Sequence, residues 1–268
     1  IMDDQALYQL YTSGTTGHPK GAVLTHQAVT TNLMQLEHAC PIQPGERLLL
    51  VVPLFHASGA DAVAFQGVYR GGALYVQADF QPAEVVRVLR EERIAVATLV
   101  PAMIQACLTA VPEVAHHPYP HLRVILYGAS AIAEQTLRRA MDVFHCDFLQ
   151  GYGMTETTVV MTILSPADHR RALAEQPGLL LSAGRSVLGT EVRIVDANDQ
   201  PVPHGTLGEI VARGPQLMQG YWNQPDATVE ALRGGWMRTG DAGVMDDEGY
   251  LYIHDRIKDM IVSGGENV

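Results

Sequence analysis

The chain has 268 residues, which is enough for one large domain or two modest ones with a substantial buried core. Its composition, 47% hydrophobic and 18% charged, excludes a largely disordered protein. The net charge of −11 argues against binding to a nucleic-acid backbone, although a few local cations and backbone N–H groups suffice for one nucleotide.

The number and spacing of the cysteines, together with the hydropathy, further limit the class of protein. The cysteines are odd in number and form no CxxC pair, so neither a disulfide framework nor a zinc site is predicted, and each is expected to be a small buried thiol. The longest apolar stretch, around Leu48–Phe55, is too short to span a bilayer. No cationic, apolar leader opens the chain, and its start at Ile1 suggests a piece of a longer polypeptide. We therefore expect a cytoplasmic protein without a transmembrane segment. The three cysteines are Cys40, Cys107 and Cys146.

From residue 6 to about residue 164, short apolar strands alternate with helical segments. Near-continuous apolar strands separated by helices predict a parallel sheet that is covered on both faces. Pro82 stands near a helix start, where its missing N–H costs nothing. The predicted strands are Ala6–Tyr11, Leu48–Val52, Ala73–Gln77, Val96–Val100, Val124–Tyr127 and Asp147–Leu149. The predicted helices are Pro82–Glu92, Ala102–Ala110 and Ala133–Phe144.

The pattern changes after Ser165. A polar segment, Pro166–Gly178, is expected to be a loop, and the strands that follow are short and broken by Gly, Pro and Asp. The Gly-terminated turn at Asp246–Gly249 predicts a hairpin. We predict an α/β fold, with a largely parallel sheet flanked by helices in residues 1–175 and a small antiparallel β-barrel-like subdomain in residues 176–256. The predicted later strands are Thr190–Val195, Gly208–Arg213, Trp236–Arg238, Ala242–Met245 and Tyr250–Ile253.

The most informative stretch is Tyr11–Gly21, which follows the first strand. Its glycines expose backbone N–H groups, its hydroxyls donate to phosphate oxygens, and Lys20 adds a positive charge. A plain Ser/Thr/Gly-rich turn is the alternative, but the stretch is too dense in such groups to favour it. A Walker A loop is disfavoured because Lys20 is preceded by Pro19 and followed by Gly21.

This stretch resembles, nearly residue for residue, the phosphate-binding loop of the adenylate-forming superfamily. That superfamily comprises acyl- and aryl-CoA synthetases, luciferases and the adenylation domains of peptide synthetases. The resemblance covers essentially the whole chain and implies ATP, Mg²⁺ and CoA, with a carboxylic acid as the other substrate. The residues that it places around the phosphates are Thr12, Ser13, Gly14, Thr15, Thr16, Gly17 and Lys20.

A second motif, Gln150–Thr157, follows the last strand of the predicted parallel sheet. A dinucleotide fingerprint fails here, because Glu156 stands where the third glycine would be. The tight turn instead offers an aromatic ring, a hydroxyl and a carboxylate, which suit adenine, a phosphate oxygen and Mg²⁺. A solvated carboxylate at a helix start is the plainer interpretation of Glu156.

The resemblance extends to this motif. It implies that Tyr152 stacks on adenine, that Thr155 contacts phosphate and that Glu156 helps to hold Mg²⁺. Lys20, Thr155 and Glu156 are therefore the predicted catalytic residues. The predicted nucleotide contacts in this motif are Gly151, Tyr152, Gly153 and Thr155.

Two later motifs complete the nucleotide site. Asp241, after a Gly turn, could simply cap that turn, but the resemblance implies that it accepts hydrogen bonds from both ribose hydroxyls. It also implies that Arg256 contacts the ribose or phosphate side of the nucleotide. Lys258 matches the hinge residue, so residues 257–268 are the expected stub to a lid domain with a further catalytic lysine. Without that lid, the chain should bind ATP weakly at best.

Weaker markers concern the acyl group. His56 matches a segment beside the carboxylate-binding tunnel, although an isolated histidine at a strand end is usually structural. Residues 128–130 match the wall beside adenine, but Ala131 departs from the family pattern, which often has a proline there. Residues 220–223 match a later motif and are expected to be scaffold. The predicted wall residues are Gly128, Ala129 and Ser130, and the predicted substrate contacts are His56, Gly128 and Gly153.

These motifs predict an AMP-forming acyl-CoA ligase for a fatty or aryl acid. The segment from Ser263 to Asn267 is most like that of stand-alone acyl-CoA synthetases, and the surroundings of His56 are rich in alanine. Asp61 is the one acidic residue that could pair with the amino group of a substrate. The alternatives are an adenylation domain that loads a carrier protein and a truncated, non-catalytic nucleotide-binding module. The oligomeric state, including a homo-oligomer, stays open.

Overall fold

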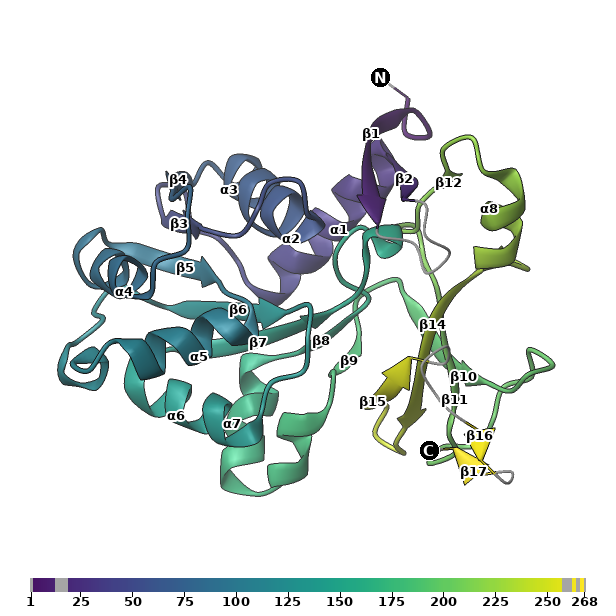
Figure 1. The fold of residues 1–268 in the computed structure, drawn as a ribbon. Coiled ribbons are helices and arrows are strands. Elements are labelled where there is room, and N and C mark those ends of the chain that lie inside the picture. Colours follow the sequence, from purple (N-terminus) through teal and green to yellow (C-terminus); the bar gives the residue numbers. More distant parts are fainter. Residues whose placement is uncertain (1, 13–18, 257–261, 264–265, 268) are drawn as a thin grey trace.

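The computed structural model describes residues 2–12, 19–256, 262–263 and 266–267. Its larger part is built around a seven-stranded sheet in which five neighbouring strands are parallel, and the last two strands at one side pair antiparallel (Figure 1). A largely parallel sheet was predicted, and this prediction is confirmed. In spatial order the strands are β4 (Ala73–Val76), β3 (Arg47–Leu50), β5 (Ile94–Thr98), β6 (Val124–Gly128), β7 (Asp147–Tyr152), β8 (Thr162–Leu164) and β9 (Arg185–Ser186).

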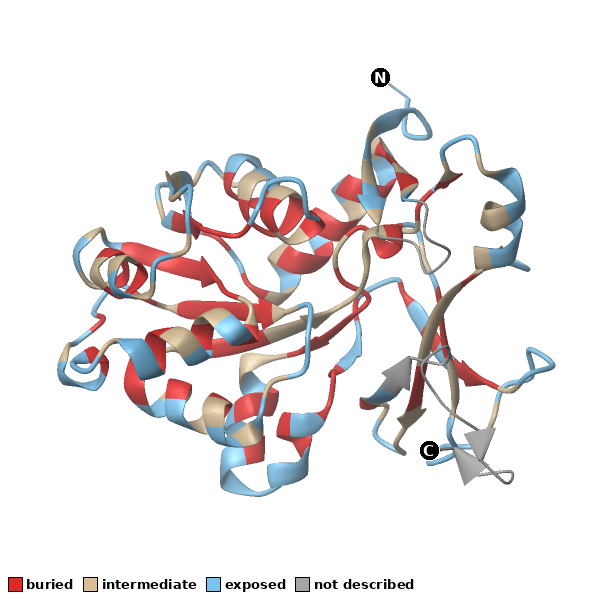
Figure 2. Ribbon diagram, in the orientation of Figure 1, coloured by how far each residue is buried: buried red, intermediate tan, exposed pale blue. Residues whose placement is uncertain are grey.

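Helices cover both faces of this sheet, and the strands alternate their side chains between the two layers. Leu48 and Leu50 pack toward α1 (His26–Ala39) and η1 (Ala60–Phe65). Leu49 packs toward the opposite layer, which consists of α4 (Pro82–Glu91), α5 (Pro101–Ala110) and α6 (Glu134–Phe144). This alternation with a period of two explains why the strands are apolar throughout. Buried residues concentrate in the strands and on the helix sides that face them (Figure 2). The helices of this part are α1 (His26–Ala39), α2 (Ala57–Gly59), the π-helix η1 (Ala60–Phe65), α3 (Gln66–Tyr69), α4 (Pro82–Glu91), α5 (Pro101–Ala110), η2 (Val114–His116), α6 (Glu134–Phe144), η3 (Thr155–Thr157), α7 (Pro166–Ala174) and η4 (Pro177–Leu181).

The first predicted strand does not belong to the parallel sheet, and that expectation is wrong. β1 (Ala6–Thr12) pairs antiparallel with β2 (Lys20–Thr25), and β12 (Gly220–Tyr221) adds to the other side of β2. The connection between β1 and β2 is too short for the crossover that parallel neighbours require. A small three-stranded sheet therefore stands apart from the larger one, between α1 and α8 (Pro225–Ala231).

The later strands form an antiparallel sheet, as predicted. The two segments expected near residues 236–238 and 242–245 are one continuous strand, β14, and the hairpin to β15 turns at Gly249 with φ +80°. The elements of this part are β10 (Glu191–Val195), β11 (Gly208–Arg213), β13 (Leu232–Arg233), β14 (Trp236–Met245) and β15 (Leu251–Arg256), with a separate pair β16 (Val262–Ser263) and β17 (Glu266–Asn267). The division of the chain at residue 175 stays a prediction.

The segment expected to be a polar loop after Ser165 is a helix, so that prediction is wrong. Pro166 occupies the first turn of α7, and the side chain of Ser165 accepts a hydrogen bond from the backbone N–H of Asp168. Asp168 in turn accepts from the backbone N–H of Ser165, which completes a capping box. These start signals were present in the sequence, but the low apolar content of the helix concealed them.

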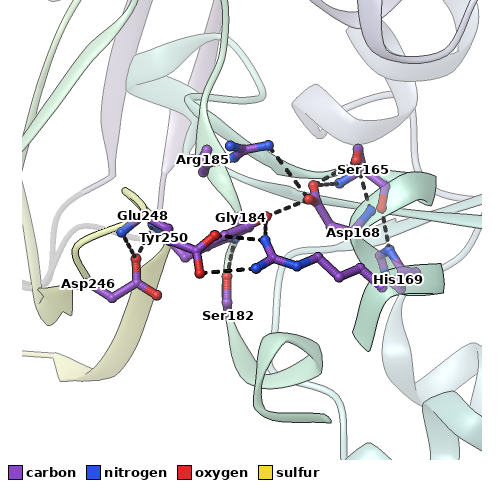
Figure 3. Close-up of polar contacts among 10 residues, drawn as sticks. Ser165, Asp168, His169, Ser182, Gly184, Arg185, Asp246, Glu248 and Tyr250 are labelled. Atoms are coloured by element: carbon purple, nitrogen blue, oxygen red, sulfur yellow. Dashed lines mark hydrogen bonds and ion pairs between the residues drawn. The ribbon is translucent and has the colours of Figure 1, made fainter. Parts of the chain in front are cut away.

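A polar cluster, buried at Asp168 and Tyr250, half-buried at Arg171 and exposed at Glu248, joins α7 to the hairpin between β14 and β15 (Figure 3). The hydroxyl of Tyr250 donates to Oδ1 of Asp168 at 2.6 Å, and Arg171 makes two contacts with Glu248. Burial by itself raises the pKa of Asp168, but hydrogen bonds from Ser165 and Tyr250 outweigh that effect and lower it. The cluster therefore fixes the hairpin, and with it β14, against the larger part of the molecule.

Among the helices of the described residues, α1 is the longest at 14 residues, and none is long and apolar enough to cross a membrane. A membrane span requires about 20 predominantly apolar residues.

Candidate active site

The carboxyl ends of β6 and β7 lie side by side and carry two of the predicted motifs. Gly128 and Gly151 are partners in the register of these parallel strands. A Cβ atom on Gly128 would lie 2.3 Å from the carbonyl oxygen of Gly151, so only glycine fits there. Ala129, directly after β6, has φ +66°, and Ala129 and Ser130 are exposed at this edge. The predicted adenine wall therefore stands next to the Tyr/Thr/Glu turn.

Glu156 is almost completely buried on this turn, with 4% of its surface exposed. Its Oε1 atom accepts a hydrogen bond from the hydroxyl of Tyr221 at 2.7 Å. Its Oε2 atom is also buried and has no hydrogen-bond partner among the residues that the structure describes. Burial, and then the charge of Glu156, raise the pKa of Tyr221, so this phenol stays neutral and acts as the donor. The solvated carboxylate considered above is therefore excluded.

Tyr221 also connects this turn to the predicted phosphate loop. It lies on β12, opposite Ala22 of β2, and the Nζ atom of Lys20 stands 5.1 Å from the centre of its ring. A cation at that distance over a tyrosine face is attracted by the ring. Lys20, Tyr221 and Glu156 thus form a continuous series, although they are far apart in sequence.

The ends of the predicted phosphate loop are also fixed. Thr12 is the last residue of β1 and pairs in register with Lys20, the first residue of β2. The hydroxyl of Thr12 donates to the carbonyl oxygen of Lys20 at 3.5 Å, so the intervening segment starts and ends at one point beside the Glu156 turn. The other loop residues, Ser13, Gly14, Thr15, Thr16 and Gly17, lie outside the described residues.

A second phenol–carboxylate pair joins two further motifs. The hydroxyl of Tyr152 donates to Oδ2 of Asp241 at 2.6 Å. Asp241 lies within β14, where its backbone N–H donates to the hydroxyl of Thr239 at 3.1 Å. Arg256 is the register partner of Asp241 on β15. The predicted adenine and ribose residues are therefore in contact, and Arg256 is placed on the neighbouring strand. Lys258 lies outside the described part of the chain.

Of the residues predicted to contact the acyl group, Gly128 and Gly153 lie at the ends of β6 and β7 near the Glu156 turn, whereas His56 lies farther along the same edge. His56 follows β3 and begins α2, and its ring lies 4.7 Å from that of Phe55. Because β5 separates β3 from β6, His56 stands apart from the Glu156 turn. Asp61 is fully buried on η1, and its Oδ1 atom accepts a hydrogen bond from the hydroxyl of Tyr8 at 2.5 Å. Asp61 is therefore already engaged with β1.

The carboxylate of Glu156 fits a magnesium ion that is held mainly by a bound triphosphate. Within the described ranges, no group of three or more His, Cys, Asp or Glu residues could hold a metal by itself. Mg²⁺ is commonly bound through one or two carboxylates together with substrate phosphates and water. The Oε2 atom of Glu156, which has no hydrogen-bond partner among the described residues, could supply one such ligand.

Sequence reasoning assigned Tyr221 only a scaffold role, yet the structure places it between Lys20 and Glu156. The signal that could have revealed it is weak, since a Gly-Tyr pair in a short strand is common. Gly153 was predicted as a contact residue. A Cβ atom there would lie 2.3 Å from the carbonyl oxygen of Val159, so the close approach of backbone already requires glycine.

A fold of this kind, with a buried glutamate beside Thr12 and Lys20, the described ends of a glycine- and hydroxyl-rich segment, is that of a nucleotide-binding enzyme domain. The family model described as AMP-binding enzyme matches residues 2–222. The chain therefore belongs to the AMP-binding enzyme family, the adenylate-forming superfamily whose motifs it carries.

Several relatives within this family are CoA ligases. The chain is 39% identical over 267 residues to a feruloyl-CoA synthase of an Amycolatopsis species, which covers all of this chain and 52% of that protein. It is 40% identical over 273 residues to a medium/long-chain-fatty-acid–CoA ligase of Mycobacterium tuberculosis, with 99% of this chain and 45% of that protein covered. The structure of o-succinylbenzoate coenzyme A synthetase from Bacillus subtilis, in complex with ATP and magnesium ion, superposes with a TM-score of 0.88 at 30% identity. That match covers 100% of this chain and 54% of the other. The chain thus spans about half the length of the curated relatives it matches.

Proposed function

We propose that the protein containing this chain uses ATP to activate a fatty or aryl carboxylic acid and then transfers the acyl group to CoA. In the first step, a carboxylate oxygen of the acid attacks the α-phosphorus of ATP, and pyrophosphate leaves. In the second step, the CoA thiol loses its proton and attacks the acyl carbon, and AMP leaves. No covalent protein nucleophile is required, so the residues of this chain act by positioning and by charge.

The observation that carries the proposal is the series Lys20–Tyr221–Glu156 beside the pair Tyr152–Asp241. Lys20 would place a positive charge on the β- and γ-phosphates, and Thr155 would donate its hydroxyl to the α-phosphate. Asp241 would accept from the ribose hydroxyls. Magnesium, when bound, would neutralise phosphate charge.

Glu156 is the residue that this scheme uses for the metal. Its Oε2 atom would be the protein ligand, since Oε1 is occupied by the hydroxyl of Tyr221. Because Tyr221 is a neutral donor, the full negative charge of the glutamate stays available to a cation.

The environment of His56 supports an acid with an apolar body. Ala57, Ala62 and Val63 are buried on the helical segment that follows it. Asp61, the one carboxylate that could have received an amino group, is 0% exposed on η1 and therefore out of reach of a substrate. An amino acid is therefore disfavoured as the substrate. A cytoplasmic location is part of the proposal and is supported by three cysteines that are free thiols in the structure.

Pyrophosphate exchange tests the first step. The protein translated from the complete reading frame is incubated with ATP, Mg²⁺, labelled pyrophosphate and each of a panel of fatty and aryl acids. The proposal predicts exchange that depends on the acid, followed by release of AMP that depends on CoA. AMP release with an acyl-carrier protein but not with CoA would identify a carrier-loading enzyme instead. If no simple carboxylic acid stimulates exchange, the proposed activity is wrong.

Glu156→Gln tests the role of the carboxylate. Glutamine can still accept the hydrogen bond from Tyr221 but carries no charge, so turnover should fall at least about 100-fold, as expected when a preorganised charge is removed from a buried site. Glu113→Gln removes an exposed glutamate charge elsewhere and should leave exchange at the wild-type rate. A non-catalytic nucleotide-binding module would instead show nucleotide affinity that Glu156→Gln hardly changes.

A further inference from the structure

The residue two positions after Glu156 has an unusual backbone. Thr158 has φ +68° and ψ −68°, and the N–H of Val159 donates to the carbonyl oxygen of Thr157 at 2.9 Å. These values define a γ-turn with positive φ, which is rare and strained. For a β-branched residue, positive φ is a genuine outlier, and such strain persists only where the surrounding structure enforces it.

Contacts from the segment at residues 216–218 hold this turn in place. Thr158 is completely buried, and its hydroxyl donates to the carbonyl oxygen of Gln216 at 2.7 Å. Two residues farther along that segment, the N–H of Met218 donates to the carbonyl oxygen of Glu156 at 2.8 Å. The same short segment therefore holds both the strained residue and the backbone of the glutamate.

Asn32, on the buried side of α1, holds the chain immediately after the turn. Its amide group pairs with the backbone of Val160 like a neighbouring strand: Nδ2 donates to the carbonyl oxygen at 2.9 Å, and Oδ1 accepts from the N–H at 3.3 Å. Nδ2 also donates to Gln35, whose own amide donates to the hydroxyl of Thr190. Asn32 is 0% exposed, so loss of either contact with Val160 would leave a buried polar group unpaired.

The two limbs of the turn are in backbone contact, which transmits this restraint to the glutamate. A Cβ atom on Gly153 would lie 2.3 Å from the carbonyl oxygen of Val159, and the N–H of Met161 donates to the carbonyl oxygen of Tyr152 at 2.8 Å. Any movement of the limb that Asn32 holds would therefore displace the limb that leads into Glu156.

We infer that Thr158 and Asn32 are positioning residues for Mg·ATP, because together they hold the strained turn that presents the Oε2 atom of Glu156, for which the described part of the chain offers no hydrogen-bond partner. This inference rests on the proposed function, in which that oxygen faces the metal. Neither residue contacts the nucleotide in this scheme. They act through the backbone of residues 156–160, and their loss should change nucleotide binding rather than only stability.

The test compares Thr158→Val with Thr158→Ser in the full-length protein. Valine has nearly the same shape but cannot donate to Gln216, whereas serine keeps the hydroxyl. Equilibrium dialysis at several Mg²⁺ concentrations measures Mg·ATP binding per folded molecule, below the lowest Tm of the set. Thr158→Val should raise the Kd for Mg·ATP about tenfold, which corresponds to about one net hydrogen bond, and Thr158→Ser should stay near wild type. Asn32→Leu, which removes the pairing with Val160, should act in the same direction.

Tyr119→Phe is the matched control. Tyr119 is buried and its hydroxyl donates to the carbonyl oxygen of Val114 at 2.8 Å, away from the carboxyl edge of the sheet. Its loss should lower stability but leave the Kd for Mg·ATP unchanged. Wild-type affinity in Thr158→Val, or an equal loss of affinity in Tyr119→Phe, overturns the inference. A wild-type protein that binds Mg·ATP without acid-dependent exchange refutes only the proposed function, whereas failure to bind Mg·ATP at all refutes both.

Discussion

Asp61 gives the sharpest prediction about stability, because its carboxyl group is buried and forms no ion pair with any residue that the structure describes. It is 0% exposed on η1, its Oδ1 atom accepts from Tyr8, and its Oδ2 atom has no partner within the described ranges. Burial raises the pKa of Asp61 to about 7, and the hydrogen bond from Tyr8 offsets only part of that effect. We expect Asp61→Asn to change the pH dependence of unfolding, since asparagine can accept from Tyr8 but does not ionise.

The sign of the effect follows from the direction of the shift. A folded-state pKa raised above the unfolded value means that the folded protein holds the proton more tightly between the two values. The fold is thus most favoured when Asp61 is protonated, and this advantage is lost as the pH rises from about 4 to about 7. A rise from 3.8 to about 7 corresponds to roughly 4 kcal/mol over the whole window. The free energy of unfolding of Asp61→Asn relative to wild type should therefore increase by up to about 1.4 kcal/mol per pH unit in that range.

Urea unfolding of this chain at pH values from 5 to 8.5 measures the difference in free energy of unfolding between Asp61→Asn and wild type. Taking the difference between variant and wild type cancels the other titrating groups, which both proteins share. Asp142→Asn, at an exposed carboxylate, should show no such slope. Tyr8→Phe should extend the pH range over which stability falls to higher pH, because it removes the hydrogen bond that lowers the pKa of Asp61. If the free energies of unfolding of Asp61→Asn and wild type differ by the same amount across this pH range, the reasoning is refuted.

Two further substitutions probe the site itself. Tyr221→Phe keeps an aromatic ring near Lys20 but removes the hydrogen bond to Glu156, so kcat/KM in the exchange assay should fall roughly 5–30-fold. A loss as large as that of the Glu156→Gln variant would contradict this ranking, because the charge is retained. Gly153→Ala places a Cβ atom 2.3 Å from a backbone carbonyl oxygen, so it should lower the free energy of unfolding by roughly 1–3 kcal/mol. Gly178→Ala is the control: its Cβ atom meets no atom within 4 Å, so the free energy of unfolding should change by less than about 0.5 kcal/mol. Equal losses of unfolding free energy in the two alanine variants would exclude the predicted clash.

Most of the larger sheet was predictable because its apolar strands and amphipathic helices alternate regularly and are separated by clear turn residues. The strands β3 to β7 are apolar runs bounded by helices, and their ends were predicted to within a few residues. The helix α1 was not predicted, because Asn32 and Gln35 interrupt its buried face. Those amides are buried only because partners from distant segments pair with them, and no local pattern reveals such partners.

The site was predictable as motifs but not as contacts. Each motif supplied residue types that suit one part of a nucleotide, and the resemblance supplied their roles. The contact between Glu156 and Tyr221 depends on β12 joining β2, which is a pairing across about 200 residues of sequence. The γ-turn at Thr158 has no sequence signature, since threonine is among the residues least expected at positive φ. Tertiary contacts, rather than propensity, decide both features.

Four phenol–carboxylate hydrogen bonds, between residues 53 to 89 positions apart, share a physical logic. They join Tyr8 to Asp61, Tyr152 to Asp241, Tyr221 to Glu156 and Tyr250 to Asp168. An arginine or lysine in place of the phenol would neutralise the carboxylate and compete with any cation or diol that the carboxylate must bind. A phenol instead fixes one oxygen, remains neutral at physiological pH, and leaves the charge and the second oxygen for another partner. At Asp168 that second oxygen accepts from Ser165, so the pair serves only to join two parts of the fold. At Asp61 and at Glu156 no described residue takes it, but Glu156 is joined through Tyr221 to Lys20 at the carboxyl edge of the sheet, so we propose that Glu156 rather than Asp61 receives magnesium.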